Sequence, residues 1–178
     1  TLTNITVTEN RGPLYCGGLT FYNSNSTVVV NSNIYNNTCG ICLRSSSSNI
    51  FHHNNFLQNN LQVITDFSAP FTNASSGIYS MNTWDNGLEG NYWTDYLGAD
   101  ENKDGIGDPS YAVNPNPTVP AESKQYDHYP LMGESYYYEI DYVNLSRVYK
   151  MVIISNSSIS DFVVEPIAFD WENRRIVF

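Results

Sequence analysis

The sequence predicts an all-β protein built on a short parallel β-helix. Three observations support this fold class: a repeat, strand-like alternation inside each repeat, and asparagine at the turns. The segment from Gly18 to Thr38 aligns with the segment from Gly40 to Asn60 at an offset of 22 residues throughout. Repeats of about 20 to 50 residues are typical of solenoids, in which each repeat stacks on the next.

Several aligned positions carry residues of the same polarity. Apolar residues fall on apolar residues at four pairs of positions: Leu19 on Ile41, Phe21 on Leu43, Val28 on Ile50 and Ile34 on Phe56. The alternation of apolar and polar residues is typical of short, half-buried strands. Asn37 falls on Asn59, and asparagine tolerates left-handed turn geometry. Stacked amides also extend hydrogen-bond ladders, so we expect a structural role for the asparagines.

Both ends of the sequence look unfinished. An earlier partial coil, "NITVTENRGPLYCGG", opens the chain without an initiator methionine or a secretory hydrophobic segment. The last residues, "RRIVF", form a strand. Open strand edges are templates for pairing, so we expect other copies of the chain to complete them in a homopolymer. Truncation of a longer chain is the rival explanation.

The composition divides the chain into three parts. Residues 1–66 are predicted to form the β-helix coils. Residues 67–132, rich in glycine, asparagine, aspartate and proline, are predicted to form a loop-rich cap in which Trp84 and Trp93 seal the last coil. Residues 133–178 return to strands such as "SYYYEIDYV" and are expected to form a C-terminal β-sandwich-like domain.

Charge and glycosylation motifs restrict the environment and the partners. The net charge is −10, with only 8 lysines and arginines, which argues against a nucleic-acid partner. No apolar run reaches the roughly 18 residues of a membrane span. Six N-glycosylation motifs favour an extracellular glycoprotein. The acceptors are Asn4, Asn25, Asn36, Asn73, Asn144 and Asn156.

Three segments of the middle region carry a family resemblance. "NIFHHNNFLQNNLQV", "NTWDNGLEGNYWTDYLGADENKDGIGDPSYAV" and "YDHYPLM" occur in this order. The chain resembles NosD-like right-handed parallel β-helix proteins of the archaeal cell-surface type. That family's namesake assists copper loading, whereas archaeal relatives look like envelope proteins. The resemblance implies an extracellular, non-enzymatic structural protein of a sheath, surface layer or filament. The alternative is a carbohydrate- or surface-binding module of a larger protein, with glycans as partners.

The segment "DENKDGIGD" predicts a structural calcium site. Alternating oxygen-bearing side chains around Gly105 are typical of a calcium-binding loop. Tyr111 stands where an EF-hand has its bidentate glutamate, so a distant ligand is needed. The predicted ligands are Asp100, Asn102, Asp104, the Ile106 carbonyl, Asp108 and, from the distant segment, Asp127.

The adjacent His52 and His53 are candidate copper ligands, because the family's namesake assists copper loading. Neighbouring residues of a strand point to opposite faces, which predicts that these two histidines do not chelate one ion. His128 is the only other histidine, and there is no methionine-rich or histidine-rich run. The sequence therefore favours a packing role for both.

The three cysteines are Cys16, Cys39 and Cys42. The spacing of "CGIC" resembles a redox motif, but such motifs open a helix, and here Gly40 begins a β coil. Cys16 and Cys39 are one coil plus one residue apart, and neighbouring strands are about 4.8 Å apart. This distance is within disulfide reach, so we expect a Cys16–Cys39 bridge.

A polysaccharide-cleaving enzyme is an alternative function, because many parallel β-helix proteins are polysaccharide lyases or hydrolases. Such chemistry needs paired carboxylates or a basic residue beside a sugar acid. Residues 1–66 contain only the acids Glu9 and Asp66 and the bases Arg11 and Arg44. This inventory is too small for a catalytic coil face, so we expect no enzymatic activity.

Overall fold

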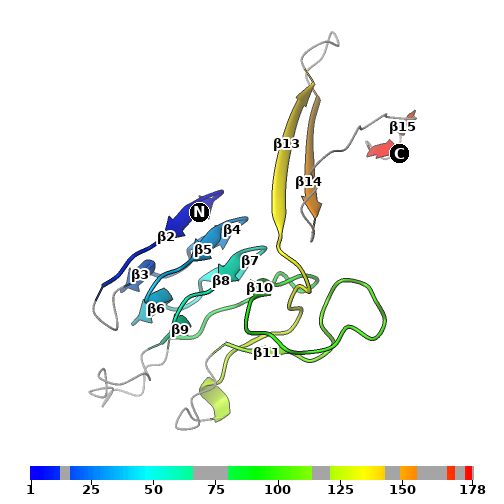
Figure 1. Ribbon diagram of the computed structural model, residues 1–178. Helices are drawn as coiled ribbons and strands as arrows, with labels where there is room; N and C mark the ends of the chain where they lie inside the picture. Colours follow the sequence, from blue (N-terminus) through cyan, green and yellow to red (C-terminus); the bar gives the residue numbers. More distant parts are fainter. Residues whose placement is uncertain are drawn as a thin grey trace.

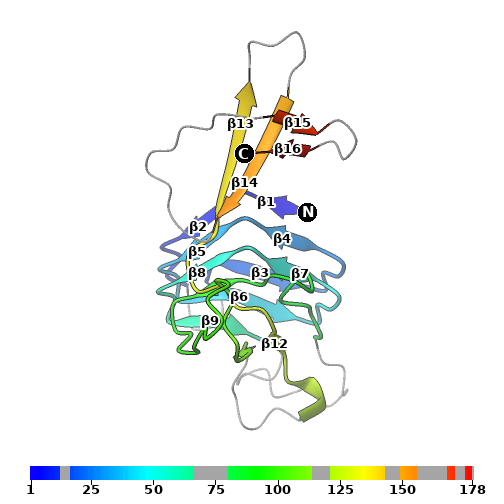
Figure 2. The ribbon, with the colours of Figure 1, turned by 90° about the vertical axis from the view of Figure 1, so that its right-hand side faces the viewer.

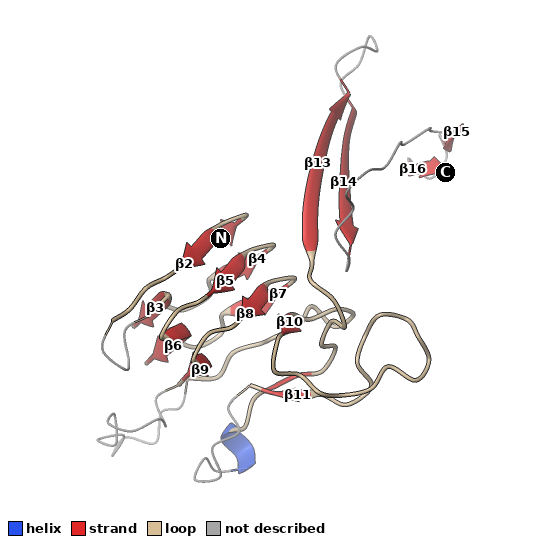
Figure 3. Ribbon diagram, viewed as in Figure 1, coloured by secondary structure: helices blue, strands red, loops and turns tan. Residues whose placement is uncertain are grey.

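A computed structural model describes residues 1–12, 17–65, 80–113, 121–142, 149–155, 168–170 and 175–177. The N-terminal strands coil around a common axis and form three parallel sheets (Figures 1 and 3). The first sheet contains β1 (Leu2–Thr3), β4 (Val28–Val30) and β7 (Ile50–His52). The second contains β2 (Thr6–Thr8), β5 (Asn33–Tyr35), β8 (Asn55–Leu57) and β10 (Tyr92–Trp93), and the third β3 (Leu19–Tyr22), β6 (Cys39–Arg44) and β9 (Leu61–Ile64). The predicted all-β fold with parallel β-helix coils is confirmed.

The strand register reproduces the 22-residue repeat. Leu19 pairs with Ile41, Val28 with Ile50, and Ile34 with Phe56. Successive coils therefore place equivalent residues above one another, as Figure 2 shows for the stacked strands. The inward residues form an apolar core, in which Val29, Ile34, Ile41, Leu43, Phe51 and Phe56 have no exposed surface, and Cys39, Cys42 and Ile64 form a second, smaller cluster.

The corners between strands are left-handed at equivalent positions of successive coils. The corner residues pair at the repeat spacing: Asn23 with Ser45, Ser26 with Ser48, Asn31 with His53 and Asn36 with Gln58. Their φ angles lie between 49° and 60°. Asparagine adopts this conformation at low cost because its short side chain bonds the local backbone. His53 occupies a corner of this kind rather than a strand position.

Asparagine ladders run parallel to the coil axis. The Asn10 amide donates to Asn37 Oδ1 at 3.0 Å, and the Asn37 amide donates to Asn59 Oδ1 at 3.1 Å. Asn37 is almost fully buried, so its polar atoms need these partners. The expected stacking of Asn37 on Asn59 is confirmed.

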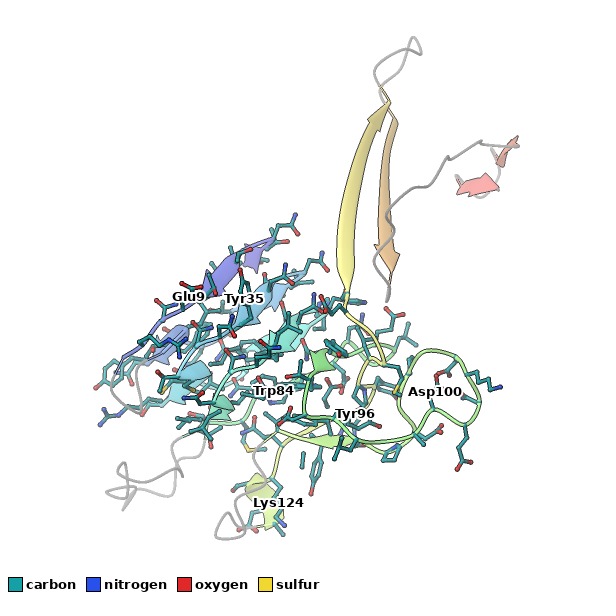
Figure 4. The ribbon with its side chains drawn as sticks, viewed as in Figure 1. Glu9, Tyr35, Trp84, Tyr96, Asp100 and Lys124 are labelled. Atoms are coloured by element: carbon teal, nitrogen blue, oxygen red, sulfur yellow. The ribbon has the colours of Figure 1, made fainter. Side chains whose placement is uncertain are left out.

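Aromatic rings cover the open end of the last coil. Trp84 stacks on Phe51 with ring centroids 4.5 Å apart, and Trp93 stacks on Phe56 at 4.2 Å. Tyr111 then stacks on Trp93 at 4.3 Å. Both tryptophans are buried, and Figure 4 shows Trp84 between the coils and the loops of the cap. Each fully buried aromatic ring contributes about 1.5–3 kcal/mol, so the rings seal the core as the sequence predicts.

A short antiparallel pair closes the cap. β11 (Tyr111–Ala112) pairs with β12 (Tyr126–Asp127), which follows the 3₁₀ turn η1 (Ala121–Ser123). Just before and within β12, Gln125 Oε1 accepts the Trp84 indole N–H at 2.9 Å, and Asp127 Oδ2 accepts the Trp93 indole N–H at 2.9 Å. Two further asparagine ladders, Asn49–Asn82 and Asn54–Asn91, end at these residues: the Asn82 N–H donates to Gln125 Oε1, and the Asn91 amide donates to Asp127 Oδ2. The buried indoles are therefore satisfied by one short segment.

The C-terminal part contains two separate antiparallel pairs. β13 (Tyr136–Tyr142) pairs with β14 (Tyr149–Ser155), and β15 (Ala168–Asp170) pairs with β16 (Arg175–Val177). The intervening residues lie outside the described ranges, so the β-sandwich-like domain stays a prediction. Among the described residues, no helix has the length and apolar character that crossing a membrane requires.

Candidate functional site

The aspartate-rich loop forms an internal hydrogen-bond network. The Asp100 carboxylate accepts the backbone N–H groups of Asp104 and Gly105 at 3.2 and 2.9 Å. Asp108 Oδ2 accepts the Glu101 N–H at 2.7 Å, and Asp104 Oδ1 accepts the Ile106 N–H at 2.9 Å. Figure 4 shows Asp100 on a loop that extends away from the coils. The carboxylates thus stabilise the loop's own backbone.

Asp127, the predicted distant ligand, belongs to the cap closure. Its side chain is fully buried. Besides Trp93, it accepts the N–H groups of Asn91 at 2.7 Å and Tyr129 at 3.1 Å. Burial raises the pKa of Asp127 to about 6, and these hydrogen bonds oppose that rise. A Cβ atom on Gly90 would overlap the Asp127 carboxylate, which leaves no room for a ligand on that side.

A second polar cluster lies at the corner after β7. His52 Nδ1 and His53 Nδ1 are 2.7 Å apart, and the ring centroids are 5.0 Å apart. His52 ends β7, while His53 takes the left-handed corner with φ 54°. The usual alternation of a strand does not apply across this corner. The expectation that the two imidazoles point to opposite faces is therefore wrong.

The contact with Glu89 selects the tautomer of His53. Glu89 Oε2 lies 2.5 Å from His53 Nε2, and a carboxylate only accepts hydrogen bonds, so Nε2 carries a proton. In the neutral imidazole, His53 Nδ1 is then an acceptor and His52 Nδ1 is the donor. A histidine whose one nitrogen binds a carboxylate has the other oriented for ligation.

The surroundings favour the neutral form of His52. Its pKa lies below the ordinary value, first because burial disfavours the charged form and next because of the neighbouring His53. Asp85 and Glu89 oppose this shift. His52 is only half-buried, whereas His53 is 4% exposed. One imidazole is thus anchored inside and the other is accessible from solvent.

The cluster offers two nitrogen donors rather than a closed coordination shell. In the described part of the chain, no group of three or more histidine, cysteine, aspartate or glutamate side chains is arranged to hold a metal ion. Glu89 is engaged with His53 Nε2. Asp85 accepts Gly87 N–H and His128 N–H through its two carboxylate oxygens. Because His52 is half-exposed, the pair is accessible from solvent on the His52 side.

The sequence repeat contains a feature that predicts the turn at His53. At the 22-residue offset, His53 falls on Asn31, a residue type that marks left-handed turns. Extending the alignment to this pair predicts that His53 turns out of the strand direction. Glu89, which lies 36 residues further on, gives no comparable signal because it belongs to the cap, outside the repeat.

The fold and this cluster define a class of protein: an all-β parallel β-helix with an open pair of imidazoles at a corner. Residues 1–98 match the family described as "Periplasmic copper-binding protein (NosD)". The chain therefore belongs to the NosD family, and the predicted location outside the cytoplasm agrees with that description.

A curated relative supports the same assignment. The "Probable ABC transporter binding protein NosD" of Stutzerimonas stutzeri is 35% identical over 99 residues. The matched region is 55% of this chain and 20% of the relative. The chain thus matches about a fifth of that relative's length.

The calcium prediction is wrong. The family is described as copper-binding, and the described residues contain no metal-holding group of three or more acidic, histidine or cysteine side chains. The physical reason lies in the hydrogen bonds. The carboxylates of Asp100, Asp104 and Asp108 accept backbone N–H groups within the loop, and the buried Asp127 accepts those of the cap.

The predicted disulfide and glycans are untested. Cys39 is buried at the start of β6, where its Sγ contacts the Ile41 carbonyl at 3.1 Å, but Cys16 lies outside the described residues. The Cys16–Cys39 bridge stays a prediction. Asn4 and Asn25 are exposed and Asn36 is half-buried. The other three acceptors, Asn73, Asn144 and Asn156, lie outside the described ranges.

Proposed function

We propose that this chain is a non-catalytic, extracytoplasmic copper-binding domain that binds copper(II) through His52 and His53. The observation that carries the proposal is the 2.7 Å separation of the two Nδ1 atoms. Imidazole is a preferred ligand of copper. The family description supports the same metal.

The separation fits two neighbouring ligands of one ion. Two nitrogen ligands at about 2.0 Å from a metal and at right angles to each other are about 2.8 Å apart. His53 Nδ1 already has its lone pair free of a proton, because Nε2 carries the proton and donates it to Glu89. His52 becomes a ligand when its proton shifts from Nδ1 to Nε2, which costs little in a neutral, half-exposed imidazole.

The site is suited to reversible binding. Two protein nitrogens leave the remaining positions of copper(II) to water or to donors from another molecule. The coil around the pair is rigid, since His53 N–H donates to the Gly90 carbonyl and Asn54 N–H donates to Asn91 Oδ1 at 3.1 Å. The scaffold therefore holds the pair in place while the open side exchanges ligands.

Titration of the metal-free chain with copper(II) tests the proposal. We expect a visible d–d band and nitrogen hyperfine structure in the electron paramagnetic resonance spectrum. His52→Ala and His53→Ala should each lose them. His128→Ala is the matched control and should bind normally, because His128 contacts Ser110 rather than the pair. Unchanged binding by the double variant of His52 and His53 would refute the proposal.

A structural role in the cell envelope is the second candidate function. It is favoured by the sheet order, in which β1, β2 and β3 are the outer strands of the three parallel sheets at one end of the stack. Outer strands offer backbone groups for pairing with another copy. Sedimentation of the isolated chain over a range of concentrations tests this role: growth into long polymers supports it, and a monomer at every concentration opposes it.

The carbohydrate-binding alternative is supported by one exposed surface pair. Tyr22 on β3 is 61% exposed, and the Arg44 guanidinium lies 5.5 Å from its ring centroid. Aromatic rings with a neighbouring polar group serve as sugar platforms. Binding to a glycan array that is lost in Tyr22→Ala would favour this role over the envelope role.

A further inference from the structure

An exposed turn between Trp84 and β10 contains the only Asn-Gly dipeptide of the sequence, Asn86–Gly87. The Asn86 N–H donates to the Glu89 carbonyl at 3.0 Å and closes the turn. We propose that Asn86 is a self-modification site. The Gly87 backbone nitrogen attacks the Asn86 side-chain carbonyl carbon, and the resulting cyclic imide opens with water to aspartate or isoaspartate.

The attacking nitrogen has a base beside it. The Gly87 N–H donates to Asp85 Oδ1 at 2.9 Å, so the carboxylate is placed to accept that proton. Asp85 is only 8% exposed, and its other oxygen accepts the His128 N–H at 3.2 Å. The base is therefore held in position by the cap.

The carbon under attack is polarised. Asn86 Oδ1 accepts two backbone N–H groups, from Leu88 and Glu89, each at 2.9 Å. Paired N–H donors stabilise the negative charge that develops on a carbonyl oxygen during attack. Nothing lies within 4 Å of the position of a Cβ atom on Gly87, which has φ 88°. Solvent water therefore reaches the turn.

The atoms balance without a further reactant except water. The bond from Gly87 N to Asn86 Cγ forms, and the bond from Cγ to Nδ2 breaks. Ammonia leaves with the proton that Asp85 took from Gly87 N. Water then adds to either imide carbonyl, and the product at position 86 is an aspartyl or an isoaspartyl residue.

The modification has a structural consequence at the histidine corner. An isoaspartyl linkage adds one methylene to the backbone three residues before Glu89, the hydrogen-bond partner of His53. It also moves the carbonyl that holds the Glu89 N–H from the Asn86 side chain into the main chain. We expect aged protein to hold His53 less firmly. The modification itself does not depend on copper binding.

Peptide mapping with electron-transfer fragmentation tests the inference. The full chain is incubated at neutral pH, folded in one sample and denatured in guanidinium in the other. We expect faster ammonia loss at Asn86 in the folded chain, and a rate at least about tenfold lower in Asp85→Asn. Equal or slower conversion in the folded chain overturns the inference, because the turn then protects Asn86. A wild-type rate in Asp85→Asn also overturns it.

Discussion

The corner at His53 and the loop from Asp100 to Asp108 are both polar turns rich in possible metal ligands. In the loop, the regular spacing of the acids serves the loop's own backbone, as the bonds to Gly105 and Ile106 show. At the corner, the left-handed conformation of His53 brings its Nδ1 atom to 2.7 Å from His52 Nδ1. The comparison teaches that ligand spacing along a chain does not by itself predict a metal site, because the loop carboxylates bind the loop's own backbone whereas the two Nδ1 atoms at the corner bond each other.

The largest expected effect is a loss of stability on replacing the buried Asp127, compared with replacing an acid of the loop. Asp127→Ala leaves the N–H groups of Asn91, Trp93 and Tyr129 without their acceptor in the sealed cap. We expect the free energy of unfolding to fall by at least about 3 kcal/mol. Asp104→Ala, at an exposed position of the loop, should change it by less than about 1 kcal/mol.

Chemical denaturation of both variants measures the difference. Equal losses of stability would show that the loop carries as much of the fold as the cap closure does. That result would contradict the assignment of the loop acids to local hydrogen bonding.

A second prediction concerns pH. The pKa of Asp127 rises from 3.8 in the unfolded chain to about 6 on folding. The folded state therefore binds this proton more tightly, and its contribution to stability is present below about pH 4 and is lost as the pH rises through 6. The contribution amounts to about 3 kcal/mol.

Thermal melts across this pH window compare the wild type with Asp127→Asn, which does not titrate. The stability of the wild type relative to the variant should decrease from pH 4 to pH 6 and stay level above it. A relative stability that increases with pH would mean that the hydrogen bonds outweigh burial and lower the pKa of Asp127.

The difference between the coils and the cap explains how much the sequence predicts. The pairs Leu19–Ile41 and Ile34–Phe56 follow from self-alignment, because a solenoid repeats its packing at a fixed offset. The cap occurs once, so its closure by Gln125 and Asp127 has no internal template. The burial of Trp84 was predictable from its size and position, but its partner Gln125, 41 residues away, was not.

The histidine corner lies between these cases. His53 belongs to the repeat, and its turn geometry was available from Asn31. Glu89 belongs to the cap, and only the folded chain brings it to His53. The repeat therefore predicts the turn at His53, but not the contact between His53 and Glu89.

A third prediction tests the role of Glu89. Glu89→Gln weakens the hydrogen bond that fixes the His53 tautomer, and we expect copper(II) affinity to fall about 10- to 100-fold. Glu122→Gln, at an exposed position of η1, is the matched control and should bind as the wild type does. Isothermal titration with copper(II) gives both affinities, and equal affinities would show that Glu89 does not orient His53.

The smallest expected effect is that of added calcium on the melting temperature. Added calcium should leave the melting temperature of the metal-free chain unchanged, because the loop carboxylates already accept backbone N–H groups. Differential scanning calorimetry with and without calcium measures this. A melting temperature that rises with calcium in the wild type, but not in Asp100→Asn, would restore the loop as a metal site.

The most direct test of the histidine pair is the position of the ion itself. Crystals of the metal-free chain soaked with copper(II) give an anomalous difference map at the copper absorption edge. The proposed site predicts one strong peak about 2.0 Å from both His52 Nδ1 and His53 Nδ1, with Glu89 still bonded to His53 Nε2. A map without a peak at this corner, or with its strongest peak at the loop from Asp100 to Asp108, would contradict the proposal.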